Sequence, residues 1–136
     1  AIQQTDVKSA SGKLLVAEDH TLNAQIIQKI LENFGYQVHV VENGQECVTA
    51  FAQAMPEEYA AILMDIRMPV MDGIEATKAI RCLKREDAGT IPIIAMTANA
   101  FEQDVRDCMA AGMNAHLSKP IVPELLYQTL RQFVKV

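Results

Sequence analysis

The feature that most constrains the fold of this chain is a regular alternation of short, mostly apolar runs with longer amphipathic stretches. The short runs cover residues 14–17, 38–41, 61–64, 93–96 and 115–118, and apolar side chains recur at helical spacing in the stretches after them. Such alternation is typical of parallel strands connected by helices. Because these connections are right-handed, we expect an α/β fold with helices on both faces of a doubly wound, five-stranded parallel sheet.

Helix start and stop signals bound the amphipathic stretches. Asn43–Glu46 and Asp72–Glu75 have the spacing of a capping box, Pro123 suits a first helical turn, and Gly35 and Gly112 are placed to end helices. The apolar positions of the predicted helices are expected to face the sheet: Leu22, Ile26, Ile27, Ile30, Leu31, Phe34, Val48, Phe51, Ala52, Met55, Ala76, Ala79, Ile80, Leu83, Phe101, Val105, Cys108, Met109, Leu126, Leu130 and Phe133.

Size and charge exclude several classes of protein. With 136 residues the chain fits one domain, and its net charge of −5 offers no electrostatic attraction to nucleic acid or to an anionic membrane. The sequence has no apolar run near the roughly 18 residues that a membrane span needs. We therefore predict a cytoplasmic domain that contacts neither nucleic acid nor membrane.

Two further features bear on the domain boundary and the compartment. Residues 1–12 are polar and aperiodic, so they are predicted to be a linker or an expression remnant, and the folded domain is predicted to span residues 13–136. Three widely spaced cysteines, Cys47, Cys82 and Cys108, form no CxxC pattern. They are interpreted as reduced cysteines that pack in the core of a cytosolic protein.

The residues that follow the predicted strands are where a ligand site is expected, because ligands bind beyond the carboxyl ends of strands in an open parallel sheet. Glu18 and Asp19 follow the first strand, Asp65 the third, Thr97 the fourth and Lys119 the fifth. We therefore expect three carboxylates, a hydroxyl and an ammonium group to converge at one edge of the sheet.

The chemistry of this group favours phosphoryl transfer. Three carboxylates repel one another unless a cation lies among them, and Mg2+ prefers oxygen ligands and accompanies phosphate chemistry. Asp65 could then act as a nucleophile toward phosphorus, with Lys119 as a second positive contact and Thr97 as a hydrogen-bond donor to a phosphoryl oxygen. A threonine contact made only in the phosphorylated state would serve as a switch.

Each of these residues also has an ordinary structural interpretation. Glu18 and Asp19 could be a solvated pair at a helix start, Asp65 a turn residue, Thr97 a helix cap and Lys119 an exposed lysine. Their convergence at one edge of the sheet favours the functional interpretation.

Four segments together resemble the receiver domains of two-component signalling systems. They read LLVAEDH around Glu18 and Asp19, ILMDIRMPVMDG around Asp65, IIAMTANA around Thr97 and AGMNAHLSKPI around Lys119. The resemblance covers about residues 13–136 and is greatest to the receivers of hybrid sensor histidine kinases. It implies a flavodoxin-like (βα)5 fold with strand order 2-1-3-4-5, and phosphoryl transfer from a phosphohistidine.

The resemblance implies a set of roles at the acidic site. Asp65 becomes the phosphoacceptor. Asp19 and Asp65 become direct Mg2+ ligands, joined by the backbone carbonyl of Arg67, while Glu18 acts largely through water. Mn2+ is a possible substitute for Mg2+. Arg67 and Asn99 occupy positions that influence the lifetime of the phosphoryl group in this family.

The resemblance also implies a switch. Thr97 becomes the switch hydroxyl and Lys119 the phosphate-binding lysine, and the Lys119–Pro120 bond, often cis in this family, would aim the ammonium group into the site. His116 lies three residues before the lysine, where an aromatic residue is common. We expect His116 to be a partly buried side chain at this switch position.

The partner implied by the resemblance is a histidine kinase core or a histidine phosphotransfer domain. Its phosphohistidine would approach the rim lined by Glu18, His20, Asn23 and Lys119. His20 follows the acidic pair, which suggests a metal ligand or a phosphohistidine, but it is interpreted as a surface residue at this rim that could contact the donor. His39 is interpreted as a structural residue of the second strand. The oligomeric state is left open.

Several functions compete with this one. The polar leader and the sequences of the four motifs favour a segment of a hybrid sensor histidine kinase, in the cytosolic portion of a membrane-bound sensor, over a stand-alone single-domain response regulator.

An Mg2+-dependent phosphatase with an aspartyl nucleophile is disfavoured, because Arg67 stands where a second carboxylate would be needed. Nucleotide or flavin binding is disfavoured by the lack of GxGxxG and GxxxxGK. A degenerate receiver that acts only as a scaffold is disfavoured by the complete site. Self-phosphorylation and autodephosphorylation are the only chemistry implied, so classification as an enzyme is left open.

Overall fold

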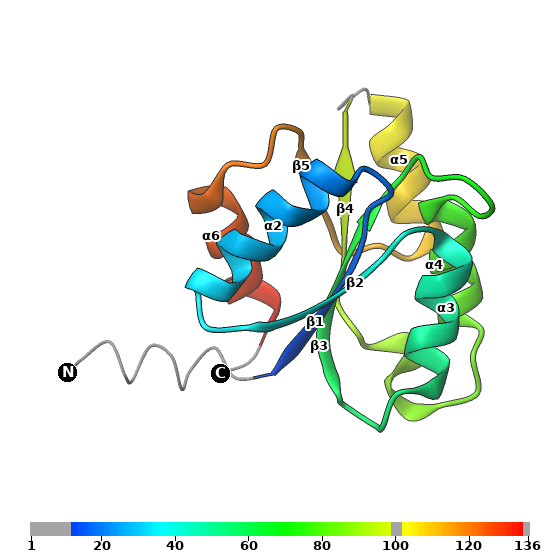
Figure 1. Cartoon of the computed structure of the whole chain (residues 1–136). Coiled ribbons are helices and arrows are strands. Elements are labelled where there is room, and N and C mark those ends of the chain that lie inside the picture. The colour runs from blue at the N-terminus through cyan, green and yellow to red at the C-terminus, as the bar shows by residue number, and fades with distance from the viewer. Residues whose placement is uncertain (1–11, 99–101, 135–136) are drawn as a thin grey trace.

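A computed structural model describes residues 12–98 and 102–134, apart from the side chains of residues 102–104. Its centre is one parallel sheet in the strand order β2-β1-β3-β4-β5, which confirms the predicted α/β fold (Figure 1). The strands are β1 (Lys13–Ala17), β2 (Gln37–Val41), β3 (Tyr59–Asp65), β4 (Ile93–Thr97) and β5 (Ala115–Ser118).

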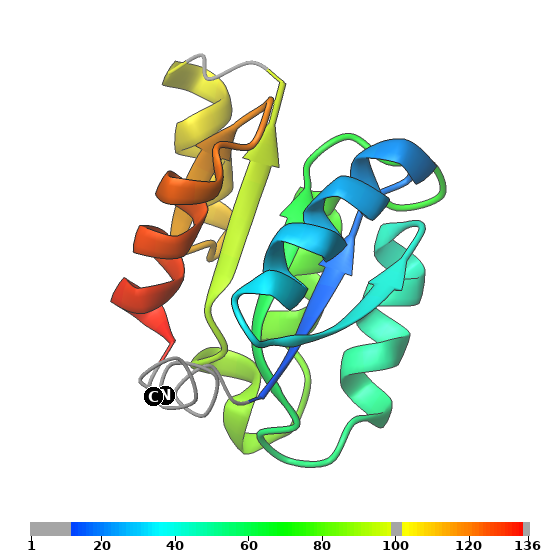
Figure 2. The same cartoon turned by 60° about the vertical axis from the view of Figure 1, so that its left-hand side comes forward.

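Helices cover both faces of this sheet, so the fold is doubly wound. Helices α2 and α6 lie on one face, and α3, α4 and α5 lie on the other (Figures 1 and 2). Within the described residues, no helix is long and apolar enough to cross a bilayer. The helices are α2 (Thr21–Asn33), α3 (Gly44–Gln53), α4 (Gly73–Arg81), α5 (Glu102–Ala111) and α6 (Pro123–Phe133), with a 3-10 turn, η1, at Glu86–Gly89.

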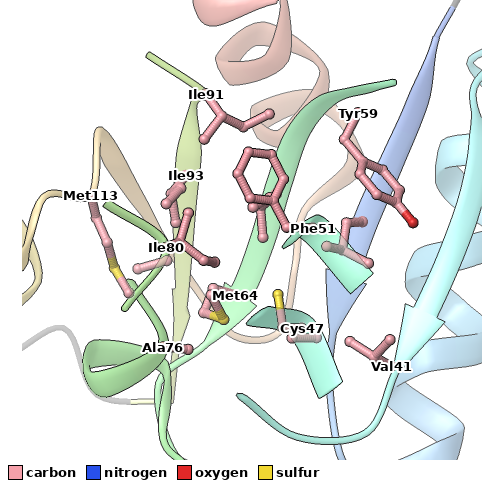
Figure 3. Packing of buried hydrophobic residues seen from close by; sticks show 14 of the residues in the cluster. Val41, Cys47, Phe51, Tyr59, Met64, Ala76, Ile80, Ile91, Ile93 and Met113 are labelled. Carbon is pink, nitrogen blue, oxygen red and sulfur yellow. The ribbon is translucent and has the colours of Figure 1, made fainter. Parts of the chain in front are cut away.

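Two apolar cores lie on opposite sides of the sheet, because successive residues of a strand point to opposite faces. Leu14 and Val16 of β1 join the core under α2 and α6, whereas Leu15 and Ala17 join the core under α3 and α4. Figure 3 shows the second core, in which Phe51 and other helix residues pack against the sheet. The central strands are therefore buried on both faces, which explains their continuous apolar sequences.

The helix caps follow the predicted patterns with one difference. Asp72 accepts a hydrogen bond from the backbone N–H of Glu75 and donates its own N–H to the Glu75 carboxylate, which completes a capping box for α4. Asn43 caps α3 by accepting from the N–H of Glu46 at 2.8 Å. The Glu46 carboxylate, however, accepts from the N–H of Glu42 rather than from that of Asn43.

Not every apolar helix position faces the sheet as predicted. The apolar stripe of α2 is wider than the surface that the sheet covers, and Met55 lies in the turn after α3 ends at Gln53. Phe101 lies outside the described residues. Five residues expected to face inward are instead exposed: Leu22, Ile26, Ala52, Met55 and Met109.

The cysteines are reduced, but only two of them pack in the core. Cys47 and Cys108 are fully buried, whereas Cys82 is exposed at the end of α4. The expectation of a packing role for Cys82 was wrong, because the chain leaves the helical path there and the side chain faces solvent.

Candidate functional site

The residues expected to carry chemistry do meet at the carboxyl edge of the sheet, the upper edge in Figure 1. Asp65 is the last residue of β3 and Thr97 the last residue of β4. Glu18 directly follows β1, and Lys119 directly follows β5. Parallel strands bring these four positions together although 101 residues separate Glu18 from Lys119.

Lys119 joins two carboxylates of the site. Its ammonium Nζ lies 2.8 Å from Oε1 of Glu18 and 3.0 Å from Oδ2 of Asp65, and its backbone N–H donates to the carbonyl of Thr97 at 2.8 Å. The Lys119–Pro120 peptide bond is cis. Because only 18% of the Lys119 side chain is exposed, the interpretation as an ordinary surface lysine is wrong.

Glu18 is held in place from several sides. Its side chain is fully buried, Oε1 accepts from Lys119, and Oε2 accepts from the backbone N–H of His20 at 3.1 Å. Its own N–H donates to the carbonyl of Val41 on β2. The alternative of a solvated acidic pair is therefore wrong for Glu18, since a buried carboxylate needs the partners found here.

The site has the donors for a hard cation. Glu18, Asp19, His20 and Asp65 each offer one ligand atom, and these atoms lie within 4.8 Å of one another. Asp19 Oδ1 is a buried oxygen that receives no well-oriented hydrogen bond from the described residues, although Nδ1 of His20 lies 3.2 Å away. A buried oxygen without such a hydrogen bond is costly unless a cation or water reaches it. The residues present therefore fit a divalent ion such as Mg2+.

The side chain of His20 lies at the rim of the site, as predicted, and it also contacts the acidic cluster. Its side chain is 70% exposed, as a rim residue should be, yet its Nδ1 lies 3.2 Å from Asp19 Oδ1 and 3.4 Å from Glu18 Oε2. Its position directly after the acidic pair is the one sequence signal for this proximity. His39 makes a structural contact on β2, where its Nδ1 lies 2.6 Å from the hydroxyl oxygen of Tyr59.

Burial and charge act against each other in the electrostatics of the site. Burial raises the pKa of Asp65 to about 6, opposed by the Lys119 hydrogen bond and reinforced by the negative charge of Glu18. Burial also works to raise the pKa of Glu18, but the hydrogen bonds from Lys119 and from the His20 N–H outweigh it and the pKa is lowered. The single ammonium group of Lys119 thus balances only part of the negative charge of the two carboxylates. A further cation would favour the ionised form of Asp65.

The two expected switch residues differ in their surroundings. Thr97 is buried at the end of β4, where its carbonyl accepts a hydrogen bond from the backbone N–H of Lys119. The interpretation of Thr97 as a helix cap concerns residues 99–101, which lie outside the described residues. His116 is exposed, so the expectation of a partly buried side chain was wrong. His116 lies on β5, an edge strand whose alternation turns the flanking Leu117 toward the core and His116 away from it. Asn99 lies outside the described residues.

The loop between β3 and α4, residues 66–72, has a defined shape. The N–H of Gly73 donates to the carbonyl of Ile66 at 2.8 Å, and the N–H of Met71 donates to that of Pro69 at 2.7 Å. Sequence reasoning missed a third contact, in which the Gly44 N–H donates to the Met71 carbonyl at 2.9 Å. Arg67 is exposed in this loop.

Comparison with known proteins gives the same class as the fold and the site. The sequence profile of the response regulator receiver domain matches residues 14–131. The receiver domain of the Pseudomonas aeruginosa sensor histidine kinase PA1611, solved with a magnesium ion in its active-site cleft, is 38% identical, with a TM-score of 0.82 over 90% of this chain and 97% of that one. This chain belongs to the response regulator receiver domain family.

Other relatives are parts of larger signalling proteins. Hybrid signal transduction histidine kinase I of Dictyostelium discoideum is 38% identical over 87% of this chain, and the sensor protein GacS of Pseudomonas syringae is 36% identical over 91%. The chain spans only 7% and 14% of these two proteins. A co-crystal structure of the Saccharomyces cerevisiae phosphotransfer protein Ypd1 with the receiver domain of Ssk1 matches with a TM-score of 0.83 at 28% identity, over 93% of this chain and 90% of that one.

Proposed function

We propose that Asp65 accepts a phosphoryl group from a phosphohistidine in an Mg2+-dependent reaction. The observation that carries this proposal is the pairing of Lys119 with both Asp65 and Glu18, beside a third carboxylate, Asp19, which lies within 4.8 Å of the other two and, in the described part of the chain, receives no Lys119 contact. This arrangement leaves the site short of positive charge, which is the condition that favours binding of a cation and then of a phosphoryl group.

The transfer exchanges one bond to phosphorus for another. A carboxylate oxygen of Asp65 attacks phosphorus, the P–N bond to the donor imidazole breaks, and that imidazole leaves with its electron pair and takes a proton. Asp19 and Asp65 are proposed as direct metal ligands, with the Arg67 carbonyl as a third and Glu18 acting through water. A bound Mg2+ supplies positive charge against the transferring phosphoryl oxygens, and Mn2+ suits the same donors.

Lys119 and Thr97 are proposed to bind the phosphoryl group after transfer. Lys119 already lies within hydrogen-bond distance of the Asp65 carboxylate, so its ammonium group can follow the charge from the carboxylate to the new phosphoryl oxygens. The hydroxyl of Thr97 is proposed to move to a phosphoryl oxygen and so act as the switch. His116 is proposed to lie at the switch position, and because it is exposed on β5 it would act from the surface.

The proposed donor is a histidine kinase core or a histidine phosphotransfer domain. Several apolar side chains of α2 and the start of α6 are exposed: Leu22, Ile26, Val122 and Leu125. A cleft of about 330 Å3 lies next to Lys119, and it is lined by Asn23, Ile26, Ile27, Ala98, Lys119, Pro120 and Ile121. Exposed apolar area next to a reactive group fits a protein donor better than a small molecule.

The chain is further proposed to be the cytoplasmic receiver of a hybrid sensor histidine kinase, with residues 1–12 as a linker. The identity to hybrid histidine kinases over most of this chain supports this assignment. A stand-alone response regulator is the alternative. An aspartyl phosphatase is less compatible with the site, because exposed Arg67 supplies no carboxylate two residues after Asp65.

Intact mass spectrometry tests the proposed function. The protein is incubated with Mg2+ and acetyl phosphate or phosphoramidate, and a gain of one phosphoryl group is expected. The gain should disappear in Asp65→Asn and when EDTA removes the metal. No adduct in the parent protein, together with no response of the site to beryllofluoride, contradicts the proposal. Sustained release of phosphate from p-nitrophenyl phosphate would favour the phosphatase instead.

A further inference from the structure

We propose that Gly44 is a positioning residue for the phosphoryl-accepting site. Its backbone N–H, at the first residue of α3, holds the loop of residues 66–72 in the shape that the site requires. The loop joins Asp65 to α4 and includes Arg67, whose carbonyl is the proposed metal ligand. The inference rests on the proposed function and extends it to a residue that touches neither metal nor phosphoryl group.

The contact between Gly44 and the loop leaves no room for a side chain. A Cβ atom added at Gly44 would lie closer than 3.0 Å to the carbonyl oxygen of Met71, the same atom that accepts the Gly44 hydrogen bond. It would also lie 3.0 Å from the carbonyl oxygen of Asp72 and from Cβ of Ala76. Glycine therefore allows this close approach of two backbones, although alanine is the better helix former.

The loop that Gly44 holds is itself strained. Val70 has a φ of 70°, in the left-handed region that a β-branched residue rarely adopts. The Met71 N–H to Pro69 carbonyl hydrogen bond closes a γ-turn around it. The Val70 side chain is 80% exposed, so its own packing cannot maintain this conformation. Such strain persists only where neighbouring contacts fix the chain on both sides.

Two contacts fix this strained turn, one after the other along the chain. The Met71 carbonyl is bound by the Gly44 N–H, and the Gly73 N–H is bound by the Ile66 carbonyl. Gly73 is packed as tightly as Gly44, since a Cβ there would lie closer than 3.0 Å to the carbonyl oxygen of Asp65. If the Gly44 contact is lost, the γ-turn can relax, and the backbone between Asp65 and Gly73 shifts with it.

A shift of this backbone would act directly on the proposed chemistry. Asp65 begins the loop and the Arg67 carbonyl lies two residues further on, so both proposed metal ligands move with it. Misplacing reacting groups by about 1 Å can slow a reaction roughly 100-fold. Gly44→Ala is therefore expected to weaken Mg2+ binding and slow phosphorylation without changing any residue that contacts the reacting atoms.

The experiment compares Gly44→Ala with Gly89→Ala. Gly89 lies in η1, and a Cβ added there meets nothing within 4 Å, so this variant controls for the glycine-to-alanine change itself. Mg2+ affinity is measured by calorimetric titration, and amide hydrogen exchange of the metal-free protein is followed by NMR. We expect Gly44→Ala to weaken Mg2+ binding and to slow labelling by acetyl phosphate, each by roughly tenfold or more. Gly89→Ala should match the parent.

Hydrogen exchange separates positioning from general destabilisation. Exchange in Gly44→Ala should accelerate at Met71, Gly73 and residue 44 and stay unchanged in β1 and β3. Parent-like Mg2+ affinity and labelling, or faster hydrogen exchange in every strand, overturns the inference.

If Gly44→Ala does not fold, Asn43→Ala loosens the start of α3 without adding an atom, and parent-like Mg2+ affinity in that variant also overturns the inference. If the parent itself takes no phosphoryl group, the proposed function fails, while exchange and Mg2+ binding still decide the role of Gly44.

Discussion

At the scale of single residues, the site has more buried negative charge than its one lysine compensates. The side chains of Glu18 and Asp65 are 0% and 7% exposed, and both accept hydrogen bonds from Lys119 Nζ. Burying carboxylates costs free energy unless each finds a partner. The site is therefore destabilised in the metal-free state, and this cost can be recovered when a cation or a phosphoryl group changes its charge.

Without metal, Asp65→Asn should stabilise the domain at neutral pH. Burial raises the pKa of Asp65 to about 6 from an ordinary value of 3.8, so the folded state holds this proton more tightly than the unfolded state. The stabilisation from the proton is present below the unfolded pKa and is lost as pH rises through the folded pKa. Urea denaturation in EDTA should show the variant about 1–3 kcal/mol more stable at pH 7 and nearly equal to the parent below pH 4. A difference independent of pH would contradict this account.

Lys119→Met should destabilise the metal-free domain by roughly 2–3 kcal/mol at pH 7. The loss is smaller than for a fully buried pair, because Asp65 can take up a proton and Lys119 is partly exposed. Mg2+ should raise the melting temperature of the variant more than that of the parent, since the ion then compensates two unpaired carboxylates. An equal Mg2+-induced shift in both proteins would show that the ion does not bind beside these carboxylates.

At the scale of elements, the site depends on helix starts as much as on strand ends. The capping box of Asp72 and Glu75 begins α4 directly after the loop of residues 66–72, and the first residue of α3 donates a hydrogen bond to the same loop. The loop is thus held between two helices whose inner faces share one core under the sheet. This packing is what keeps Val70 in its strained conformation.

Val70→Asn should stabilise the domain by about 1 kcal/mol, because asparagine tolerates a positive φ far better than a β-branched residue. Little burial is lost, since the valine side chain is 80% exposed. Chemical denaturation measures the change, with Met55→Asn as a control at another exposed apolar position. A stability below that of the parent would mean that the Val70 side chain makes contacts that matter more than the strain.

At the scale of the whole molecule, the two cores on either side of the sheet keep the central strands, and hence the strand-end residues, in register. β1, β3 and β4 contribute to both cores, so their backbones cannot shift without disturbing apolar packing on both faces. The edge strands β2 and β5 are less buried. The residues with the firmest positions at the site therefore follow the central strands.

The reactivity of the three cysteine thiols should differ between the buried core and the surface. Cys82 is exposed, whereas Cys47 and Cys108 are fully buried, and burial raises the pKa of the Cys47 thiol to about 12. Ellman's reagent should therefore modify Cys82 rapidly in the folded protein and the other two only after unfolding, roughly a thousandfold more slowly. Cys82→Ser should abolish the fast phase. A second fast thiol would show local opening of one core.

Much of this protein follows from its sequence alone, because the relevant signals are local or set by strand ends. Five apolar runs with helical periods between them predicted a parallel sheet, and the family resemblance implied its strand order; the structure confirms both. Glu18, Asp19, Asp65, Thr97 and Lys119 were expected at one edge because parallel strands end together, and they are found there. Their individual roles in phosphoryl transfer stay predictions.

Only the tertiary structure decided which atoms meet. Lys119 pairs with Glu18 and Asp65, and Gly44 contacts Met71, so these contacts join residues from separate elements. The burial of the Asp19 oxygen likewise depends on neighbouring elements. No periodicity or cap pattern encodes such distances, because they depend on how whole helices pack on the sheet. The exposure of His116 and of part of the α2 stripe has the same cause: the sequence shows that a side chain is apolar or aromatic, but the neighbouring elements decide whether anything covers it.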